Sequence, residues 1–104
     1  MRKAAGQNQT FVIMSTNNNL NEKPSWFDVA SISETLDARQ MLQAGQHPLT
    51  EVITKTSGMR PGQIFELITP FAPMPLIEKV IDKGFDAYVM TVSDSEVHTY
   101  FCKS

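Results

Sequence analysis

The apolar run QIFELITPF, at residues 63–71, limits the fold of this chain more than any other feature of its sequence. Nearly all of its residues are apolar, which is typical of a strand buried within a sheet that has cover on at least one face. Pro70 cannot donate a hydrogen bond to a neighbouring strand, so the strand is expected to end there. The chain is therefore expected to build a sheet around this segment.

Strand and helix patterns alternate before and after this run. Residues 31–37 alternate apolar and polar side chains, as a strand with one buried face does. Residues 48–57 show apolar side chains at helical spacing, with a proline in the first turn and Gly58 at the end. Residues 73–83 repeat this arrangement ahead of Gly84. Each of these segments is long enough for one strand or one helix.

The last part of the chain is predicted to be a hairpin. Residues 85–92 and 97–103 have strand character and are joined by the turn SDSE. The complete order β-α-β-α-β-β predicts an α/β (α+β) two-layer sandwich, with a four-stranded mixed sheet and two helices on one face. The expected core consists of Leu36, Leu49, Val52, Ile53, Ile64, Leu67, Ile68, Leu76, Val80, Ile81, Val89 and Phe101.

Residues 1–25 differ in character from the rest of the chain. They are polar and rich in asparagine, and such a segment cannot bury enough apolar surface to offset the entropy of ordering it. A mobile N-terminal tail is expected at 1–25, followed by one domain at 26–104. Met14 is a second candidate start of the chain, so the place of residues 1–13 in the natural protein stays open.

Composition excludes several functional classes. The 104 residues carry a formal net charge of −2, which provides no basic patch for nucleic acid. No apolar run approaches the roughly 20 residues that cross a bilayer. Cys102 is the one cysteine, so an intramolecular disulfide is impossible. A cytoplasmic protein is expected, with no nucleic-acid partner and no membrane contact.

His47 is the first candidate for a functional residue. It precedes Pro48 at the expected start of a helix, on the edge where α/β units concentrate their ligand sites. Free N–H groups at a helix start favour anions, and an imidazole there could bind a metal, form a hydrogen bond or act as a base. The alternative interpretation is that His47 only caps the helix ahead of Pro48.

Asp37 and Arg39 are the next candidates, because both stand at the end of the strand that leads toward His47. Asp37 could orient the imidazole, and Arg39 could hold an anionic partner. The alternative is a local turn bond from Asp37 beside a solvated Arg39. No Ser-His-Asp order, glycine-rich phosphate loop or pair of catalytic carboxylates stands out, so an enzyme is not favoured.

Metal chemistry has limited support in the sequence. His47, His98 and Cys102 are the only histidine and cysteine residues, and no structural zinc spacing occurs. Methionines such as Met41 and Met74 could supply thioether ligands beside His47 for copper, iron or haem. Methionine more often fills gaps in a core, however.

Several short motifs resemble the SirA/TusA superfamily of small sulfur-carrier-like proteins, and most closely a bacterial branch of unknown function with an LDxR…HP pattern. The motifs are LDAR (36–39), HPL (47–49), RPGQIFEL (60–67), PMPL (73–76) and KGFDAY (83–88). The resemblance implies the same β-α-β-α-β-β order. In the sulfur-carrier members of the superfamily, a Cys-Pro pair opens the first helix, and this cysteine carries a persulfide.

This chain departs from the carrier pattern at the decisive residue. His47 stands where the carriers have the cysteine, Thr50 stands where they have a second proline, and the loop before Pro48 is longer. An imidazole cannot hold a sulfane sulfur, and Cys102 matches no motif cysteine. Persulfide transfer is therefore not expected.

Two functional hypotheses follow from these residues. The favoured one is a small non-enzymatic binding or accessory module that uses His47, Arg39, Asp37 and Pro48 to dock a partner protein or a small anion, without a cofactor. The alternative is a redox accessory in which His47 binds copper, iron or haem. A homodimer formed through an uncovered sheet face is also open.

Overall fold

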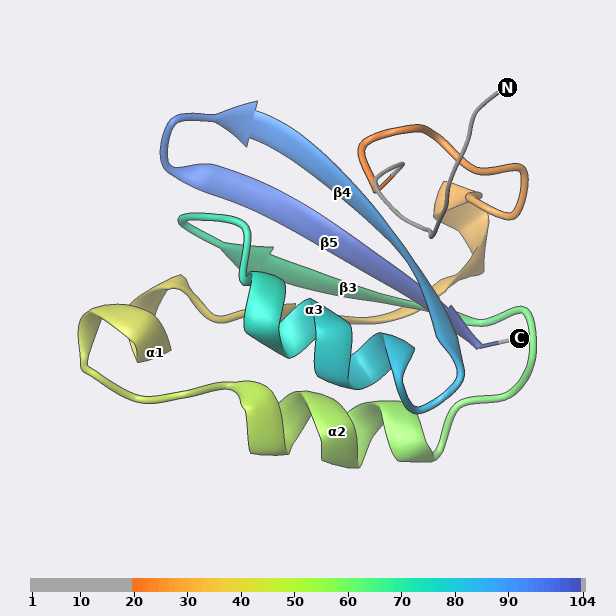
Figure 1. Cartoon of the computed structure of the whole chain (residues 1–104), viewed down its shortest axis with the longest axis horizontal. Coiled ribbons are helices and arrows are strands. Elements are labelled where there is room, and N and C mark those ends of the chain that lie inside the picture. The colour runs from red at the N-terminus through yellow and green to blue at the C-terminus, as the bar shows by residue number, and fades with distance from the viewer. Residues whose placement is uncertain (1–19, 104) are drawn as a thin grey trace, which may run out of the picture.

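The computed structural model describes residues 20–103, which fold around one four-stranded sheet (Figure 1). The strands lie in the order β2-β3-β5-β4. Their bounds are Ile32–Asp37 for β2, Ile64–Thr69 for β3, Phe85–Ser93 for β4 and Glu96–Lys103 for β5. The tail predicted for residues 1–25 falls, over residues 1–19, outside the described part of the chain.

The sheet is mixed, as the order of sequence patterns predicts. β2 and β3 are parallel, and the chain between them forms α1 (Arg39–Gln43) and α2 (Leu49–Ser57). α3 (Met74–Ile81) connects β3 to β4. β4 and β5 form an antiparallel hairpin, and β5 also pairs antiparallel with β3 at the centre of the sheet. The predicted α/β two-layer class and the four-stranded mixed sheet are confirmed.

α1 is an additional helix in a segment that the sequence assigns to a loop. It has only five residues, too few for the helical spacing of apolar side chains to show in the sequence. Met41 and Leu42 pack against the edge of the core, and Gly45 ends the turn with a φ of 79°. This backbone conformation favours glycine, so the chain can turn there toward His47.

α2 and α3 cover one face of the sheet with their apolar stripes. Val52 and Thr56 of α2 are buried, and the Thr56 hydroxyl donates to the Val52 carbonyl at 2.8 Å. α3 buries Leu76, Ile77 and Val80. The prediction that Ile81 belongs to the core is wrong, because its side chain is 37% exposed at the end of the helix.

The main core lies between these two helices and the sheet. Phe65 and Phe101 are fully buried at its centre, on β3 and β5. Of the remaining predicted core residues, some are buried and others lie half-buried: Val52, Ile64, Leu67, Leu76, Val80 and Val89 in the first group, and Leu36, Leu49, Ile53 and Ile68 in the second. None of the helices in residues 20–103 is long and apolar enough to cross a membrane.

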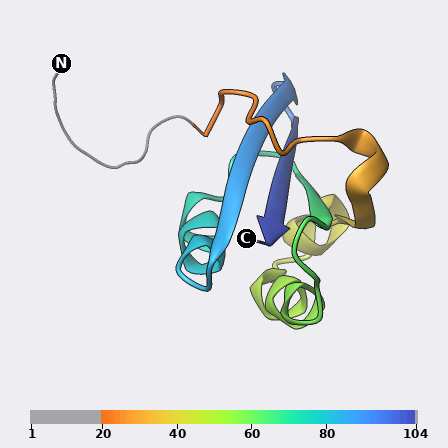
Figure 2. The same ribbon diagram turned by 90° about the vertical axis from the view of Figure 1, so that its right-hand side faces the viewer.

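The segment that leads into β2 covers part of the opposite face of the sheet (Figure 2). The Val89 N–H on β4 donates to the Leu20 carbonyl at 2.7 Å, which holds the start of this segment. The Phe27 ring then meets Tyr88 and Tyr100 edge-on, with ring centroids 5.1 and 4.6 Å away. A short 3-10 helix, η1 (Val29–Ser31), continues into β2. Within residues 20–103, no helix lies over the other end of this face.

Candidate functional site

His47 lies at the mouth of a groove of about 340 Å³ between the starts of α2 and α3. The His47 side chain is exposed, whereas Pro48 and Pro73, which precede the two helices, are buried. The surface of the groove is almost entirely apolar, and Lys79 contributes its one lysine or arginine side chain. The residues that line it are Leu42, His47, Pro48, Leu49, Phe71, Pro73, Pro75, Leu76 and Lys79.

Two helix starts meet at this groove. The first hydrogen bond inside α2 runs from the Val52 N–H to the Pro48 carbonyl, and the first inside α3 runs from the Ile77 N–H to the Pro73 carbonyl, both at 2.9 Å. At α2 the amide groups before this bond have no partner inside the helix, as at every helix start. At α3, the Met74 N–H donates to the Ala72 carbonyl at 3.0 Å, and Pro75 has no N–H. A proline at the cap position has no side-chain oxygen to accept from these amides. The groove is therefore apolar with a positive electrostatic bias.

The His47 ring forms no hydrogen bond with any other side chain or backbone group of residues 20–103. No side-chain cap bond forms at the α2 start either. The capping interpretation of His47 is therefore not supported by the contacts of these residues. An exposed imidazole beside an apolar groove is instead placed to touch whatever enters it.

Asp37 and Arg39 pair with each other and not with His47. The Arg39 Nε and Nη2 atoms donate to the two Asp37 carboxylate oxygens at 3.0 and 2.7 Å, and the Arg39 backbone N–H donates to Asp37 Oδ1 at 3.1 Å. This pairing through Arg39 lowers the pKa of Asp37 and raises the pKa of Arg39. The predicted site residues thus divide into the groove pair, His47 and Pro48, and an ion pair at the end of β2.

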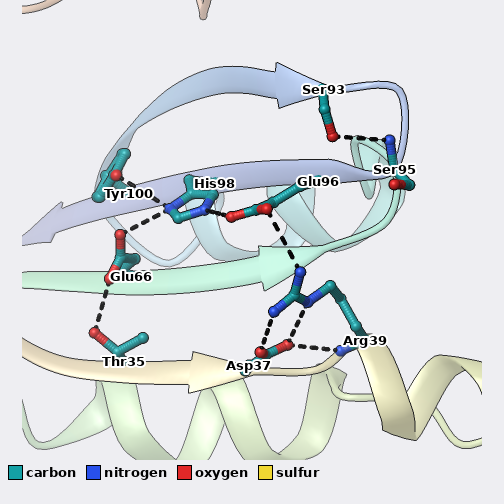
Figure 3. A network of polar contacts seen from close by, with 9 residues as sticks. All are labelled: Thr35, Asp37, Arg39, Glu66, Ser93, Ser95, Glu96, His98 and Tyr100. Atoms are coloured by element: carbon teal, nitrogen blue, oxygen red, sulfur yellow. Dashed lines mark hydrogen bonds and ion pairs between the residues drawn. The ribbon is translucent and has the colours of Figure 1, made fainter.

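Arg39 connects this ion pair to a second histidine (Figure 3). Arg39 Nη1 lies 3.5 Å from Glu96 Oε1, and the other oxygen of Glu96 lies 2.7 Å from His98 Nε2. His98 Nδ1 lies 2.9 Å from Glu66 Oε2, and the Thr35 hydroxyl donates to Glu66 Oε1 at 2.8 Å. We call the set Thr35, Asp37, Arg39, Glu66, Glu96, His98 and Tyr100 the sheet-face network.

His98 is the most enclosed histidine in the described part of the chain, with 16% of its side chain exposed. Burial alone would lower the pKa of His98, but hydrogen bonds to Glu96 and Glu66 and their negative charges raise it above its ordinary value. Burial would raise the pKa of Glu66, and the hydrogen bonds from His98 and Thr35 lower it instead. Burial and the nearby Glu66 carboxylate raise the pKa of Tyr100.

Strand register brings the members of this network together. Thr35 on β2 stands opposite Glu66 on β3, and Glu66 stands opposite Tyr100 on β5. Residues 96, 98 and 100 alternate along β5 and therefore share a face. The sequence interpretation missed the network because His98 was considered only as a metal ligand near Cys102. The signal for it was Glu66, an acidic residue inside the most apolar run of the chain, which needs a partner when buried.

No group of three or more histidine, cysteine, aspartate or glutamate side chains between residues 20 and 103 is placed to hold a metal ion. Met41 packs against the core, and Met74 lines a different groove, between α3 and β4. A metal or haem site at His47 therefore stays a prediction.

The chain was compared with known proteins at three levels. No protein-family model, no curated protein and no solved structure matches it. The resemblance to the SirA/TusA superfamily remains a prediction that rests on the order and spacing of the motifs LDAR, HPL, RPGQIFEL, PMPL and KGFDAY.

Proposed function

We propose that this chain is a small, non-enzymatic binding module that docks a partner protein in the groove beside His47. The observation that carries the proposal is the groove itself, an open apolar hollow at the meeting point of two helix starts. We further propose that the docked element is a short apolar segment that carries a carboxylate. The resemblance to small sulfur-carrier-like proteins agrees with an accessory role, and we propose that the chain plays this role in the cytoplasm.

The apolar lining supports a docking role. Phe71 is 55% exposed at the groove, although burying a large aromatic side chain would be favourable. Leu49 of α2, Leu76 of α3 and Leu42 of α1 also line the groove. An aromatic residue next to a hollow is a common energetic centre of protein interfaces. An apolar side chain of the partner would fill the hollow and cover Phe71.

The charges at the groove support an acidic group on the partner. Lys79 lines the groove, and the amide groups in the first turn of α2 favour a negative charge. His47 is exposed at the mouth of the groove and can donate a hydrogen bond to a carboxylate. The acidic residues nearest in sequence to the groove residues are Glu51, in the first turn of α2, and Glu78, beside Lys79; neither lines the groove.

The alternative function, a redox accessory with a metal or haem bound by His47, has less support. The methionines proposed as further ligands do not line the groove that His47 lines. Titrating the purified, untagged chain with copper, iron or haem would favour this alternative if His47→Ala abolished the uptake.

A peptide titration followed by NMR tests the docking proposal. The probe is a capped pentapeptide, Gly-Leu-Asp-Leu-Gly, and the comparison peptide has asparagine in place of aspartate. We expect the aspartate peptide to shift the amide signals of Leu42, Leu49 and Leu76. Phe71→Ser should weaken binding by about thirtyfold or more, since a central aromatic contact contributes about 2 kcal/mol or more. Lys79→Gln should remove the preference for aspartate.

Val29→Ser is the matched control, because Val29 is 69% exposed and lies on η1, away from the groove. This variant should bind like the original chain. The proposal is wrong if Val29→Ser and Phe71→Ser weaken binding of the aspartate peptide equally. It is also wrong if the amides that shift lie on the opposite face of the sheet. Self-association that is lost on Phe71→Ser would identify a second copy of the chain as the occupant.

A further inference from the structure

We propose that His98 is a protonation-controlled tie across the uncovered end of the sheet. The charged ring joins β5 to β3 and, through Glu96 and Arg39, to the start of α1. The neutral ring releases one of these connections. This device is separate from the groove beside His47, and it stands whether or not that groove binds a partner.

The geometry of the ring carries the inference. His98 Nδ1 lies 2.9 Å from a Glu66 oxygen, and His98 Nε2 lies 2.7 Å from a Glu96 oxygen. An ionised carboxylate can only accept hydrogen bonds, so both ring nitrogens must carry a proton to satisfy both contacts. A neutral imidazole has one proton and can satisfy only one of the two. The arrangement therefore fits the imidazolium form of His98.

Loss of the proton turns one contact into a repulsion. A nitrogen lone pair would then face a carboxylate oxygen at less than 3 Å, with both groups partly shielded from water. Glu66 is held in place by the Thr35 hydroxyl and is 15% exposed. Glu96 is 33% exposed and stands at the start of β5, so it is the group free to turn toward water. Its departure would also break the contact between Glu96 and Arg39, which would stay paired with Asp37.

The charged groups around the His98 ring make the tie depend on whether the ring is protonated. Glu66 faces it from β3, and Glu96 and Tyr100 face it from β5. Asp37 of β2 and Arg39 of α1 lie one contact further out, while the β4 residue opposite His98 is the uncharged Met90. When the His98 ring is charged, the three carboxylates of this network are balanced by two cations, His98 and Arg39. When the ring is neutral, Arg39 is the one cation left among them.

The pH at which the tie opens follows from these surroundings. The carboxylates hold the pKa of His98 above its ordinary value of 6.5, despite the opposing effect of burial. The tie therefore contributes fully to stability below about pH 6.5, the value for histidine in an unfolded chain. The contribution is lost as the pH rises through the higher pKa of the folded state.

An NMR titration of the histidine rings tests the tie directly. The chain has two histidines, so His47→Gln leaves His98 as the only imidazole signal. We expect its titration midpoint to lie above 6.5 and to move down in the variants Glu66→Gln and Glu96→Gln. In the same titration, we expect the amides around Glu96 and Arg39 to shift with the ring. A midpoint at or below 6.5, unmoved by both glutamine variants, would overturn the proposal.

Unfolding measurements at several pH values provide a second, independent test. Between pH 6 and pH 9 we expect the equilibrium constant for unfolding to rise by roughly 1.5- to fivefold, the range for partly exposed ion pairs. His98→Gln should flatten this dependence, because glutamine does not titrate. His47→Gln, the matched control, should retain it. A pH dependence that survives His98→Gln unchanged would assign it to other groups and refute the tie.

Discussion

At the scale of single residues, Thr99 is the buried polar side chain that the fold leaves unsatisfied. It is fully buried on β5, and its hydroxyl is the one buried side-chain polar atom in residues 20–103 with no hydrogen-bond partner. Its neighbours in register are Leu67 on β3 and Val89 on β4, both of which belong to the core. Such a hydroxyl gives up its bonds to water and receives none in return.

Thr99→Val should therefore stabilise the protein. Valine has the shape of threonine without the hydroxyl, and we expect the free energy of unfolding to rise by about 1 kcal/mol. Chemical denaturation of the original chain and the variant measures this difference. Thr56→Val is the matched control, because the Thr56 hydroxyl is also buried but donates to the Val52 carbonyl. That change should lower the free energy of unfolding, and equal effects of the two changes would contradict the argument.

The sequence located the candidate residues better than it located their contacts. Asp37 and Arg39 were expected near His47 because all three lie along one connection after β2. Arg39 is the first residue of the five-residue helix α1, which separates it from His47 and is too short to be predicted from its sequence pattern. Arg39 turns instead to Asp37 and to Glu96, which is 57 positions further along the chain. Only the register of β2, β3 and β5 brings these charges together, and a single sequence does not state that register.

At the scale of elements, α2 has few fully buried side chains, although Leu49 and Ile53 also pack, half-buried, against the core. Val52 and Thr56 are its buried residues, and only Val52 is apolar. Lys55 adds an ion pair with Glu34 on β2, but both groups are partly exposed, and such pairs contribute little. The helical spacing in the sequence correctly predicted α2, whereas the number of its residues that reach the core depends on how it packs.

Val52→Ala should lower the free energy of unfolding more than the substitution of any exposed residue of α2. Removing two buried methyl groups costs their transfer free energy and leaves a small cavity, so we expect a loss of about 2 kcal/mol. Thermal or chemical unfolding measures the loss, and amide exchange should show α2 opening first. Thr54→Ala is the control, because Thr54 is exposed in the same helix. A loss as large in the control would show that helix propensity, and not burial of Val52, governs α2.

At the scale of the whole molecule, the order of strands and helices was predictable, and the boundary of the folded unit was less so. Alternating patterns and two proline-led helices leave few topologies open for a four-stranded sheet. Polar residues at 20–25 gave no sign that Leu20 meets the edge of β4 or that Phe27 packs between two tyrosines. These contacts join segments far apart in the sequence: Leu20 packs against the main core at the edge of β4, and Phe27 covers part of the face opposite the helices.

Cys102 provides a reporter for this closure, because it is the one cysteine of the chain and lies in the cluster beneath Phe27. It is 6% exposed, and burial, followed by the charge of Asp86, raises the pKa of its thiol. A thiol reagent should therefore label it slowly in the folded protein. Phe27→Ala removes the ring that packs against Tyr88 and Tyr100, so the segment should open more often.

We expect labelling of Cys102 in Phe27→Ala to be faster by roughly three- to tenfold at constant pH, the range set by losing one or two aromatic contacts. Val29→Ala, on the same segment but with an exposed side chain, should label like the original chain. Denaturation curves measured beside the labelling separate local opening from global unfolding, because local opening accelerates labelling beyond the change in global stability. Equal labelling rates in all three proteins would mean that the segment does not protect this face. Faster labelling confined to Phe27→Ala would show that residues 20–31 belong to the folded domain, because the aromatic cluster would then need this segment to exclude water.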